Sequence, residues 1–272
     1  MNELALFAGA GGGILGGKLL GWRTVCAVEW EPYPASVLCA RQNDGLLPPF
    51  PIWDDVQTFD GRPWRGIVDV VSGGFPCQDI SAAGKGDGLD GERSGMWKDM
   101  ARVVGEVRPR YVFVENSPML TTRGGTRVVG DLAAMGYDCR WTVMGAADVG
   151  ANHQRDRMWI LGESKRKRLE GQRSQSGQQE VPEFRDAGSL ADTQDEGDVW
   201  RKWVMGFVEQ EHDSRGGEAN GCRKWWKTEP NVGRVANGVA ARVDRLKAIG
   251  NGQVPLCAAE AWKLLTSDLR LQ

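Results

Sequence analysis

The chain has 272 residues, of which 41% are hydrophobic and 26% charged, and its formal net charge at pH 7 is −2. This composition is typical of a globular protein with one large core, and the near-neutral charge means that a nucleic-acid partner must meet a local basic face. The N-terminal residues show neither a basic region nor a long apolar run, so we expect no signal peptide, no membrane partner and a cytoplasmic location.

The N-terminal sequence predicts a strand, a glycine loop and a helix, at residues 4–7, 8–13 and 14–21. Glycines let the backbone approach a ligand closely, and a helix N-terminus offers N–H groups to a polar or anionic group. A second predicted strand, at residues 24–28, ends on Glu29, an acid placed to bind ribose hydroxyls. These features together indicate a cofactor that contains a nucleoside.

The glycine loop also admits two other interpretations. The spacing of Gly11, Gly13 and Gly16 satisfies the dinucleotide fingerprint, so a nicotinamide-dependent dehydrogenase is a rival hypothesis. A glycine-rich turn that binds no ligand is the second alternative.

A buried, β-branched strand is predicted at residues 67–71, stopped by Gly73-Gly74 and followed by Pro76-Cys77. This arrangement presents the Cys77 thiol at the end of a strand, where parallel α/β sheets place their working loops. Free cysteines more often act as small buried hydrophobes, which is the alternative for Cys77. The six cysteines are scattered without a C-x-x-C pair, which predicts reduced thiols and no metal site.

Two more predicted strands bring acids to the same sheet edge. Residues 52–56 carry Asp55, and residues 111–114 end at Glu115. Because the carboxyl ends of parallel strands line one crevice, both acids should lie near Cys77. A buried glutamate with a raised pKa can protonate a ring nitrogen while a thiol attacks the ring. The alternative for Glu115 is a structural carboxylate that caps a helix or pairs with an arginine.

Arg155 and Arg157 precede the apolar residues 158–161 and are predicted to share one face of a strand. At the mouth of the crevice they could hold a base carbonyl, a phosphate or Glu115. A solvated surface pair is the alternative.

In chain order, these features resemble the motifs of the cytosine-C5 DNA methyltransferase family. The matching residues are Phe7-Ala8-Gly9-Ala10-Gly11-Gly12, Glu29, Asp55-Val56, Pro76-Cys77-Gln78, Glu115-Asn116, Arg155-Asp156-Arg157 and the run 245–255, which contains Gly250-Asn251-Gly252-Gln253-Val254-Pro255. A dehydrogenase accounts only for the first of these motifs. One departure is His153, which stands where much of the family has glutamine.

The resemblance implies an α/β fold with a doubly wound, mostly parallel sheet of the S-adenosylmethionine-dependent, Rossmann-like type. Residues 1–162 and 229–272 form the expected catalytic domain, completed by a C-terminal helix near residues 254–265. Residues 163–228 are polar and of low complexity, with a few tryptophans beside basic residues. They are expected to form a short, irregular target-recognition lobe.

The resemblance also implies methyl transfer from S-adenosylmethionine to C5 of cytosine in double-stranded DNA, at a short sequence and after base flipping. Cys77 would add covalently to C6 of the base. Glu115 would bind the exocyclic amine and N3, with Asn116 in support. Arg157 would contact O2 of the base, and Arg155 would hold phosphate or orient Glu115.

Two further sets of contacts carry over from the resemblance. The expected cofactor residues are Phe7, Gly9, Gly11, Glu29, Trp30, Asp55, Val56, Pro76, Asn251 and Val254. The expected DNA contacts lie in a glycine-rich loop and are Gln78, Ser81, Lys85 and Arg93.

Two related functions remain open beside DNA methylation. One is the same reaction on a structured RNA, and the other is a catalytically silent DNA-binding relative. Intact Cys77, Glu115 and Arg157 argue against silence. We expect a monomer of the restriction-modification type.

Overall fold

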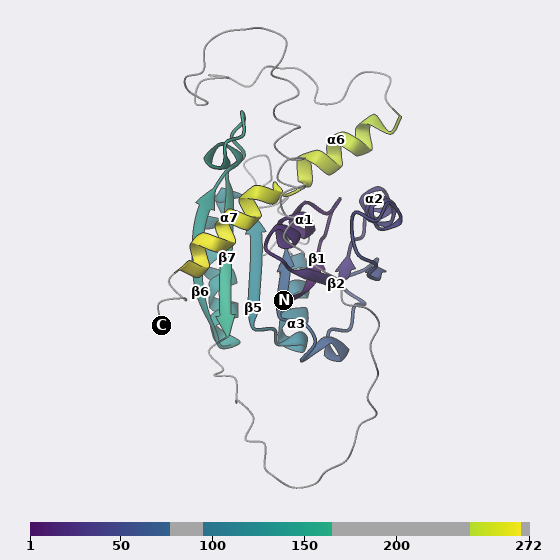
Figure 1. Cartoon of the computed structure of the whole chain (residues 1–272). Helices are drawn as coiled ribbons and strands as arrows, with labels where there is room; N and C mark the ends of the chain where they lie inside the picture. Colours follow the sequence, from purple (N-terminus) through teal and green to yellow (C-terminus); the bar gives the residue numbers. More distant parts are fainter. Residues whose placement is uncertain (77–94, 165–239, 268–272) are drawn as a thin grey trace, which may run out of the picture. The chain divides into compact units, whose positions relative to one another are not determined.

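A single seven-stranded sheet organises the part of the chain that the computed structural model describes, which is residues 1–76, 95–164 and 240–267 (Figure 1). Its strand order is β3-β2-β1-β4-β5-β7-β6. The strands are β1 (Asn2–Leu6), β2 (Arg23–Val28), β3 (Ile52–Trp53), β4 (Val70–Gly73), β5 (Tyr111–Asn116), β6 (Tyr137–Met144) and β7 (Arg157–Ser164). β1 to β5 pair in parallel, whereas β7 runs antiparallel to both β5 and β6. The predicted doubly wound, mostly parallel sheet is confirmed.

Sheet topology fixes where a ligand site can form. The strand order reverses between β1 and β4, which are neighbours in the sheet. In open α/β sheets, ligands bind beyond the carboxyl ends of the strands at such a reversal point. The glycine loop follows β1, and the stretch leading to Pro76 follows β4, so both connections leave the sheet at this point.

Three predicted strand boundaries are wrong. β4 begins at Val70, and Ile67 lies in a preceding turn with its side chain 50% exposed. β3 spans two residues and ends before Asp55. β5 continues through Glu115, which faces Trp159 of β7 in the pairing register. The acid therefore lies inside the strand and is held more rigidly than a loop residue.

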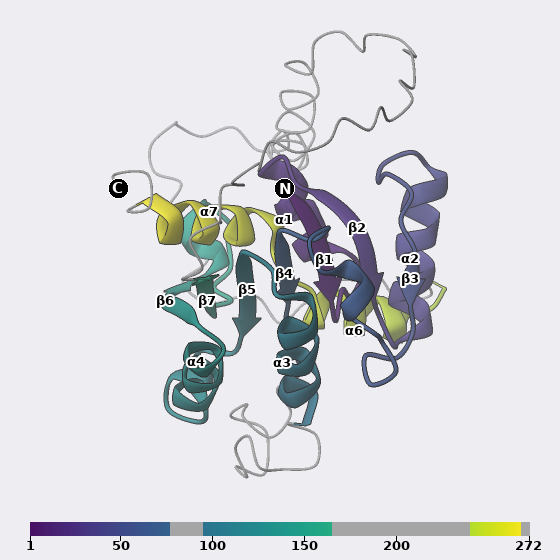
Figure 2. The same cartoon turned by 90° about the horizontal axis from the view of Figure 1, so that it is seen from below.

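Helices cover both faces of the sheet (Figure 2). They are α1 (Gly12–Leu19), α2 (Pro32–Asn43), α3 (Gly95–Val107), α4 (Gly125–Ala134), α6 (Arg242–Asn251) and α7 (Pro255–Thr266). α3 and α4 lie on one face, and α1 and α7 lie on the other. The predicted C-terminal helix is confirmed as α7. None of the described helices is long and apolar enough to cross a membrane.

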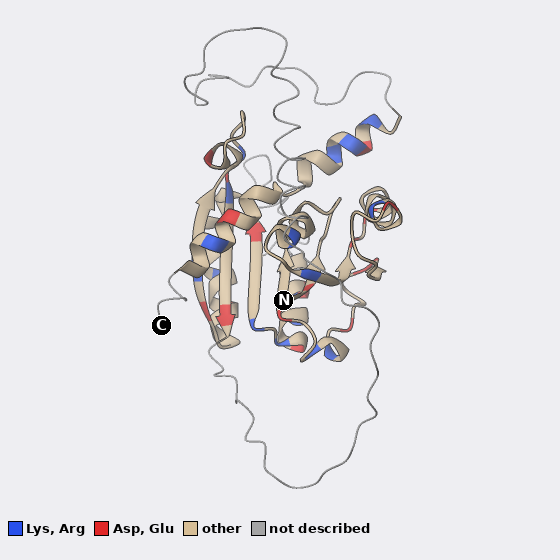
Figure 3. Ribbon diagram, in the orientation of Figure 1, with Lys and Arg blue, Asp and Glu red and all other residues tan. Residues whose placement is uncertain are grey.

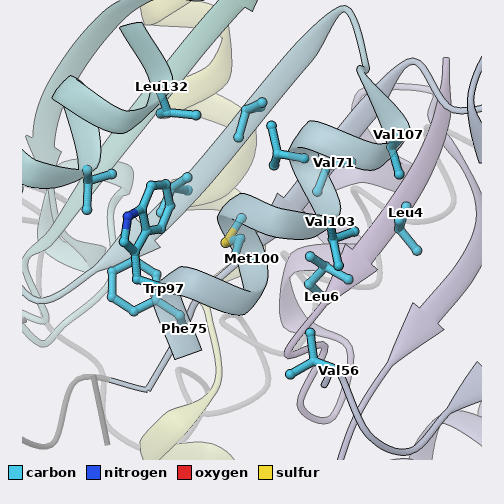
Figure 4. Packing of buried hydrophobic residues seen from close by; sticks show 14 of the residues in the cluster. Leu4, Leu6, Val56, Val71, Phe75, Trp97, Met100, Val103, Val107 and Leu132 are labelled. Carbon is cyan, nitrogen blue, oxygen red and sulfur yellow. The ribbon is translucent and has the colours of Figure 1, made fainter. Parts of the chain in front are cut away.

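Alternating strand residues supply hydrophobic cores on both faces of the sheet, because successive side chains of a strand point to opposite faces. On the α3 and α4 face, Leu4 and Leu6 pack with Trp97 and Met100, all at most 2% exposed (Figure 4).

The opposite face is rich in aromatic side chains. Trp22 and Trp262 meet edge to face with ring centroids 4.6 Å apart, and Phe113 stacks on Trp159 at 5.4 Å. Trp262 belongs to α7, so these contacts fix the C-terminal helix on the sheet.

Charged side chains gather mainly on the helices and at strand ends (Figure 3). Basic residues lie along α6, and one of them, Lys247, forms an ion pair with Glu31 at 2.7 Å. Glu31 occupies the N-cap position of α2. This pair therefore places α6 beside the connection that leaves the end of β2.

Candidate active site

The glycine loop at the end of β1 begins with an unusual backbone conformation. Phe7, Gly9 and Gly11 all have positive φ, at 52°, 56° and 91°. At Gly11 a Cβ atom would lie 2.8 Å from Cδ2 of Leu38 on α2. Both the backbone conformation and the close packing therefore require glycine at this position.

Glu29 joins the end of β2 to this loop. Its Oε2 accepts a hydrogen bond from the backbone N–H of Gly9 at 2.6 Å, and its Oε1 accepts one from Glu31 at 2.8 Å. The side chain is 8% exposed, and burial raises the pKa of the carboxyl group while the two backbone hydrogen bonds lower it. Each carboxylate oxygen can accept more than one donor, so these contacts leave acceptor capacity.

The other expected cofactor residues divide into exposed and buried groups. Trp30 is 69% exposed, and Asn251 is exposed at the end of α6. Asp55 accepts the N–H of Gln57 at 2.9 Å. The Val56 side chain points into the core (Figure 4). Only the backbone of Val56 is therefore available to a ligand.

Val254 precedes α7 and packs against the aromatic core of that face. Its position beside the glycine helix α1 agrees with a C-terminal segment that closes the loop region, because α1 and α7 pack together. Contact of Val254 with a cofactor stays a prediction.

Glu115 is the acid at the centre of the site. It is 8% exposed, and its Oε1 lies 2.8 Å from Nε of Arg157. Burial raises the pKa of the Glu115 carboxyl group, whereas the charges of Arg157 and Arg155 oppose that rise. A buried carboxyl group with a raised pKa can deliver a proton near neutral pH.

Asn116 connects β5 to the residues that precede Cys77. Its Nδ2 donates to the carbonyl of Phe75 at 3.1 Å, and its Oδ1 accepts the N–H of Ser117 at 2.8 Å. Asn116 is 3% exposed, so the contact is well shielded. The neighbouring Pro76 is exposed and is the last residue described before Cys77.

Several predicted site residues lie outside the described residues, so their roles stay predictions. They are Cys77, Gln78, Ser81, Lys85 and Arg93. Most of the expected recognition region, 165–228, also lies outside the described residues, and Glu163 and Ser164 end β7.

The prediction that Arg155 and Arg157 share a strand face is wrong. β7 begins at Arg157, and Arg155 precedes it with a φ of 116°. Its Nη2 donates to the carbonyls of Gly250 and Gly252, both at 2.6 Å. Arg155 therefore fastens the C-terminal motif to the start of β7, while Arg157 reaches Glu115.

Two glycines of the dinucleotide fingerprint allow the C-terminal segment to pack closely on α1. A Cβ on Gly13 would lie 2.5 Å from Oε1 of Gln253, and a Cβ on Gly16 would lie 2.7 Å from that of Ala258 on α7. Gln253 is not among the predicted site residues. Its signal in the sequence is a polar side chain within the matching run 245–255, between Asn251 and Val254.

A comparison with family models identifies the chain. Residues 1–237 match the model described as C-5 cytosine-specific DNA methylase. The chain belongs to this family. The match ends before the run 245–255, which the structure nevertheless places against α1 and β7.

Individual members of the family share the matched region. The chain is 34% identical over 162 residues to the Type II methyltransferase M.CviJI of Paramecium bursaria Chlorella virus IL3A, covering 59% of this chain and 42% of that protein. It is 32% identical over 165 residues to M.NgoBI of Neisseria gonorrhoeae, covering 59% of this chain and 50% of the relative. The chain thus spans about half the length, or less, of these curated relatives.

A solved structure supports the fold. The crystal structure of S. pombe Dnmt2 methyltransferase superposes with a TM-score of 0.59 at 15% identity and covers 99% of both chains. At this identity the similarity concerns the fold alone.

Proposed function

We propose that this family member transfers a methyl group from S-adenosylmethionine to C5 of cytosine in double-stranded DNA, at a short specific sequence. The observation that carries the proposal is the buried Glu115 carboxyl group, paired with Arg157 at 2.8 Å. It lies one residue from Asn116, which holds the chain just before Pro76-Cys77.

The reaction requires a nucleophile because C5 of cytosine is itself unreactive. The Cys77 thiolate adds to C6, and its electron pair forms the S–C6 bond while the C5=C6 electrons move toward C5 and the N3–C4 unit. C5 then takes the methyl group that S-adenosylmethionine would supply, and S-adenosylhomocysteine would be the leaving group. The C5 proton passes to solvent water, and its C–H electrons restore the C5=C6 double bond and expel the Cys77 thiolate, so the enzyme returns to its initial state.

Glu115 assists the addition of the thiolate. In its protonated form the carboxyl group donates to N3 of cytosine and accepts a hydrogen bond from the exocyclic amine, which stabilises the charge that develops on the ring. Burial favours this protonated form. Arg157 contacts O2 of the base with its guanidinium group, which has five N–H donors.

The residues at the ends of β1 and β2 fit S-adenosylmethionine. Glu29 is fixed by the N–H of Gly9 and retains acceptor capacity for ribose hydroxyls. Phe7 is half-buried at the loop entrance, where its ring can stack on adenine. When bound, S-adenosylmethionine supplies the electrophilic methyl group.

The target base must leave the duplex, because C6 is not accessible to a thiolate inside the base stack. Gln78, Ser81, Lys85 and Arg93 are proposed to contact the opened DNA. Residues 163–228 are proposed to read the sequence, with their tryptophan and basic residues.

Base-resolution 5-methylcytosine sequencing tests the function. The protein and its Cys77→Ala variant are expressed in a bacterial host without DNA methylation, and genomic DNA is sequenced. We expect methylation at one short motif with the wild type and none with the variant. Unmodified DNA from cells that contain soluble wild-type protein would contradict the proposal and favour an RNA substrate or a silent DNA-binding protein.

Trapping distinguishes catalysis from binding alone. Duplex DNA that contains 5-fluorocytosine in the motif cannot lose a proton from C5 after methyl transfer. We expect a covalent complex with the wild type that depends on S-adenosylmethionine. A protein that binds this DNA without forming the adduct is not the proposed enzyme.

A further inference from the structure

Gln253 lies between α6 and α7 and extends into the active site from the C-terminal side. Its backbone carbonyl occupies the space into which a side chain on Gly12 would point. Its side-chain Oε1 faces Gly13, where a Cβ would lie only 2.5 Å away. The first turn of α1 is therefore packed directly on this residue.

The nitrogen end of the same amide faces the catalytic carboxyl group. A Cβ on Gly74 would lie 3.0 Å from Nε2 of Gln253 and would also clash with Oε2 of Glu115. The Gln253 amide and the Glu115 carboxyl group therefore lie at the same backbone position, and interaction with the Gln253 side chain lowers the pKa of Glu115 in opposition to burial. The amide thus presents its nitrogen to Glu115 and its oxygen to α1, an orientation in which it donates to the ionised carboxylate.

The backbone around Gln253 is held in place independently of its side chain. Arg155 donates to the carbonyls of Gly250 and Gly252 at 2.6 Å each. Pro255 begins α7, whose aromatic contacts fix it on the sheet. The amide of Gln253 therefore extends from a rigid support, and it is half-buried.

We propose that Gln253 is a positioning residue that fixes the orientation of the Glu115 carboxyl group and ties it to the glycine turn of the cofactor loop. The inference rests on the proposed function. Gln253 does so through one planar amide, with the nitrogen on Glu115 and the oxygen against Gly13.

The charged groups that face Glu115 are Arg157 and Arg155, both from the β7 side. Gln253 adds a neutral donor from the C-terminal side. All three favour the ionised carboxylate, in opposition to burial. Removing the Gln253 donor should therefore raise the pKa of Glu115 further and release its orientation.

The test uses Gln253→Met, which keeps the length of the side chain and removes its donor. Gln42→Met is the control, because the same exchange on α2 removes an amide that makes a defined contact, its Oε1 accepting the backbone N–H of Phe50 at 3.0 Å. The free energy of unfolding is measured as a function of pH for the wild type and both variants. The same two substitutions are also made and measured in a protein that carries Glu115→Gln.

We expect the stability difference between the wild type and Gln253→Met to change with pH, because the difference includes the ionisation of Glu115. This dependence should vanish in the Glu115→Gln background, and Gln42→Met should show none. A stability difference that is independent of pH, or that persists without the Glu115 carboxyl group, overturns the inference. The stability measurement needs no methyl transfer, so it tests the role of Gln253 even if the proposed function is wrong.

Single-turnover methyl transfer gives the second readout. We expect Gln253→Met to lower the maximal rate about tenfold and to move the alkaline limb of the pH profile upward by about one unit, the effect of one lost charge-assisted hydrogen bond. Gln42→Met should leave the profile in place. Methylation by Gln253→Met with the wild-type rate and profile overturns the inference while the proposed function stands.

Discussion

The Nε atom of Arg157 lies 2.8 Å from Oε1 of Glu115, across the pairing of β7 with β5. Because β7 runs antiparallel to β5, Met158 near the start of β7 pairs with Asn116 at the end of β5, and Arg157 directly precedes Met158. This is how an arginine that opens one strand reaches an acid that lies near the end of another. The antiparallel insertion of β7 therefore builds the active site as well as completing the sheet.

Loss of this ion pair should slow the reaction strongly. Arg157→Met keeps an unbranched side chain but removes the charge, which raises the pKa of Glu115 and leaves the carboxyl group without its partner. We expect the single-turnover rate to fall by about 10²–10³, the effect of losing one preorganised electrostatic contact. The measurement is methyl transfer at saturating S-adenosylmethionine.

Arg127→Met is the control for Arg157→Met. It breaks the Arg127–Asp131 pair, at 3.1 Å, on the exposed surface of α4. Exposed ion pairs of this kind contribute little to stability. The protein should therefore stay folded, and the rate of methyl transfer should not change. Equal activity of the two variants would show that the Arg157–Glu115 pair is only structural.

The parallel part of the sheet follows from the sequence because its strands are short apolar runs that end in glycines or acids. The start of β4 does not follow from the sequence. Val70 begins the strand because both β1 and β5 pair with β4 from this residue on, whereas Ile67 is β-branched but has no neighbouring strands to pair with. The same applies to Glu115, which is part of β5 because β7 pairs with it through Asn116.

In the candidate site, too, some features can be predicted from the sequence and others cannot. The sequence predicts the residue types, since Glu29 and Glu115 both lie at the expected sheet edge. The contacts of Arg155 and Gln253 depend on how the C-terminal segment packs on parts of the chain that are distant from it in the sequence. Local patterns hold no information on that packing, and a positive φ at Arg155 is not typical of its residue type.

Substitution of Gly12 should destabilise the protein through the C-terminal segment. A methyl group on Gly12 would meet the backbone of Gln253, which cannot move aside as a flexible side chain can. We expect Gly12→Ala to lower the free energy of unfolding by about 1–3 kcal/mol, as overpacking does. Urea denaturation followed by tryptophan fluorescence measures the change.

Gly130→Ala provides the opposite case. Gly130 lies within α4, and a Cβ there would meet nothing within 4 Å. Alanine restricts the unfolded chain, so we expect a gain of about 0.4–1 kcal/mol. If both variants change stability in the same direction, the packing of Gln253 on Gly12 is not the reason why position 12 requires glycine.

Asn116 should be needed for attack by Cys77. Asn116→Asp preserves the size of the side chain, removes the donor to the Phe75 carbonyl and adds a negative charge beside Glu115. We expect slower formation of the 5-fluorocytosine adduct, by about tenfold or more, and a loss of stability of about 1–3 kcal/mol from the unpaired buried carbonyl. The rate of adduct formation is followed by denaturing gel electrophoresis.

The matched control for Asn116→Asp is Asn2→Asp. Asn2 also donates from Nδ2 to a backbone carbonyl, that of Ile67 at 2.9 Å, but at an exposed position. The adduct should form at the wild-type rate. An Asn116→Asp variant that traps DNA as fast as Asn2→Asp would show that the Phe75 contact does not position the Cys77 segment.

Glu3 should make the stability of the protein depend on pH. It is fully buried under α1, and its two oxygens accept hydrogen bonds from Thr24 at 2.7 Å and Ser72 at 2.6 Å. Burial raises its pKa from 4.5 to about 7, and the two hydroxyl donors only partly oppose that rise. Between these two pH values the folded protein holds a proton that the unfolded chain has lost.

This difference in bound protons sets the sign of the effect. The contribution of Glu3 to stability is fully present below pH 4.5 and is lost as the pH rises to about 7. The loss is on the order of 3 kcal/mol, from 1.36 kcal/mol for each pKa unit. Glu3→Gln keeps the shape of the side chain without the ionisation, so its stability relative to the wild type should increase across this range.

Chemical denaturation at intervals between pH 4 and 8 measures the Glu3 effect as the difference between the two proteins, so that shared carboxyl groups cancel. Asp60→Asn is the control without a slope in this range, because hydrogen bonds with Arg62 lower the pKa of Asp60 from its usual 3.8 and the group stays ionised in the folded and the unfolded protein. A constant difference between the wild type and Glu3→Gln across this range would mean that folding does not raise the pKa of Glu3. In that case the Thr24 and Ser72 hydroxyl groups stabilise a buried carboxylate by themselves.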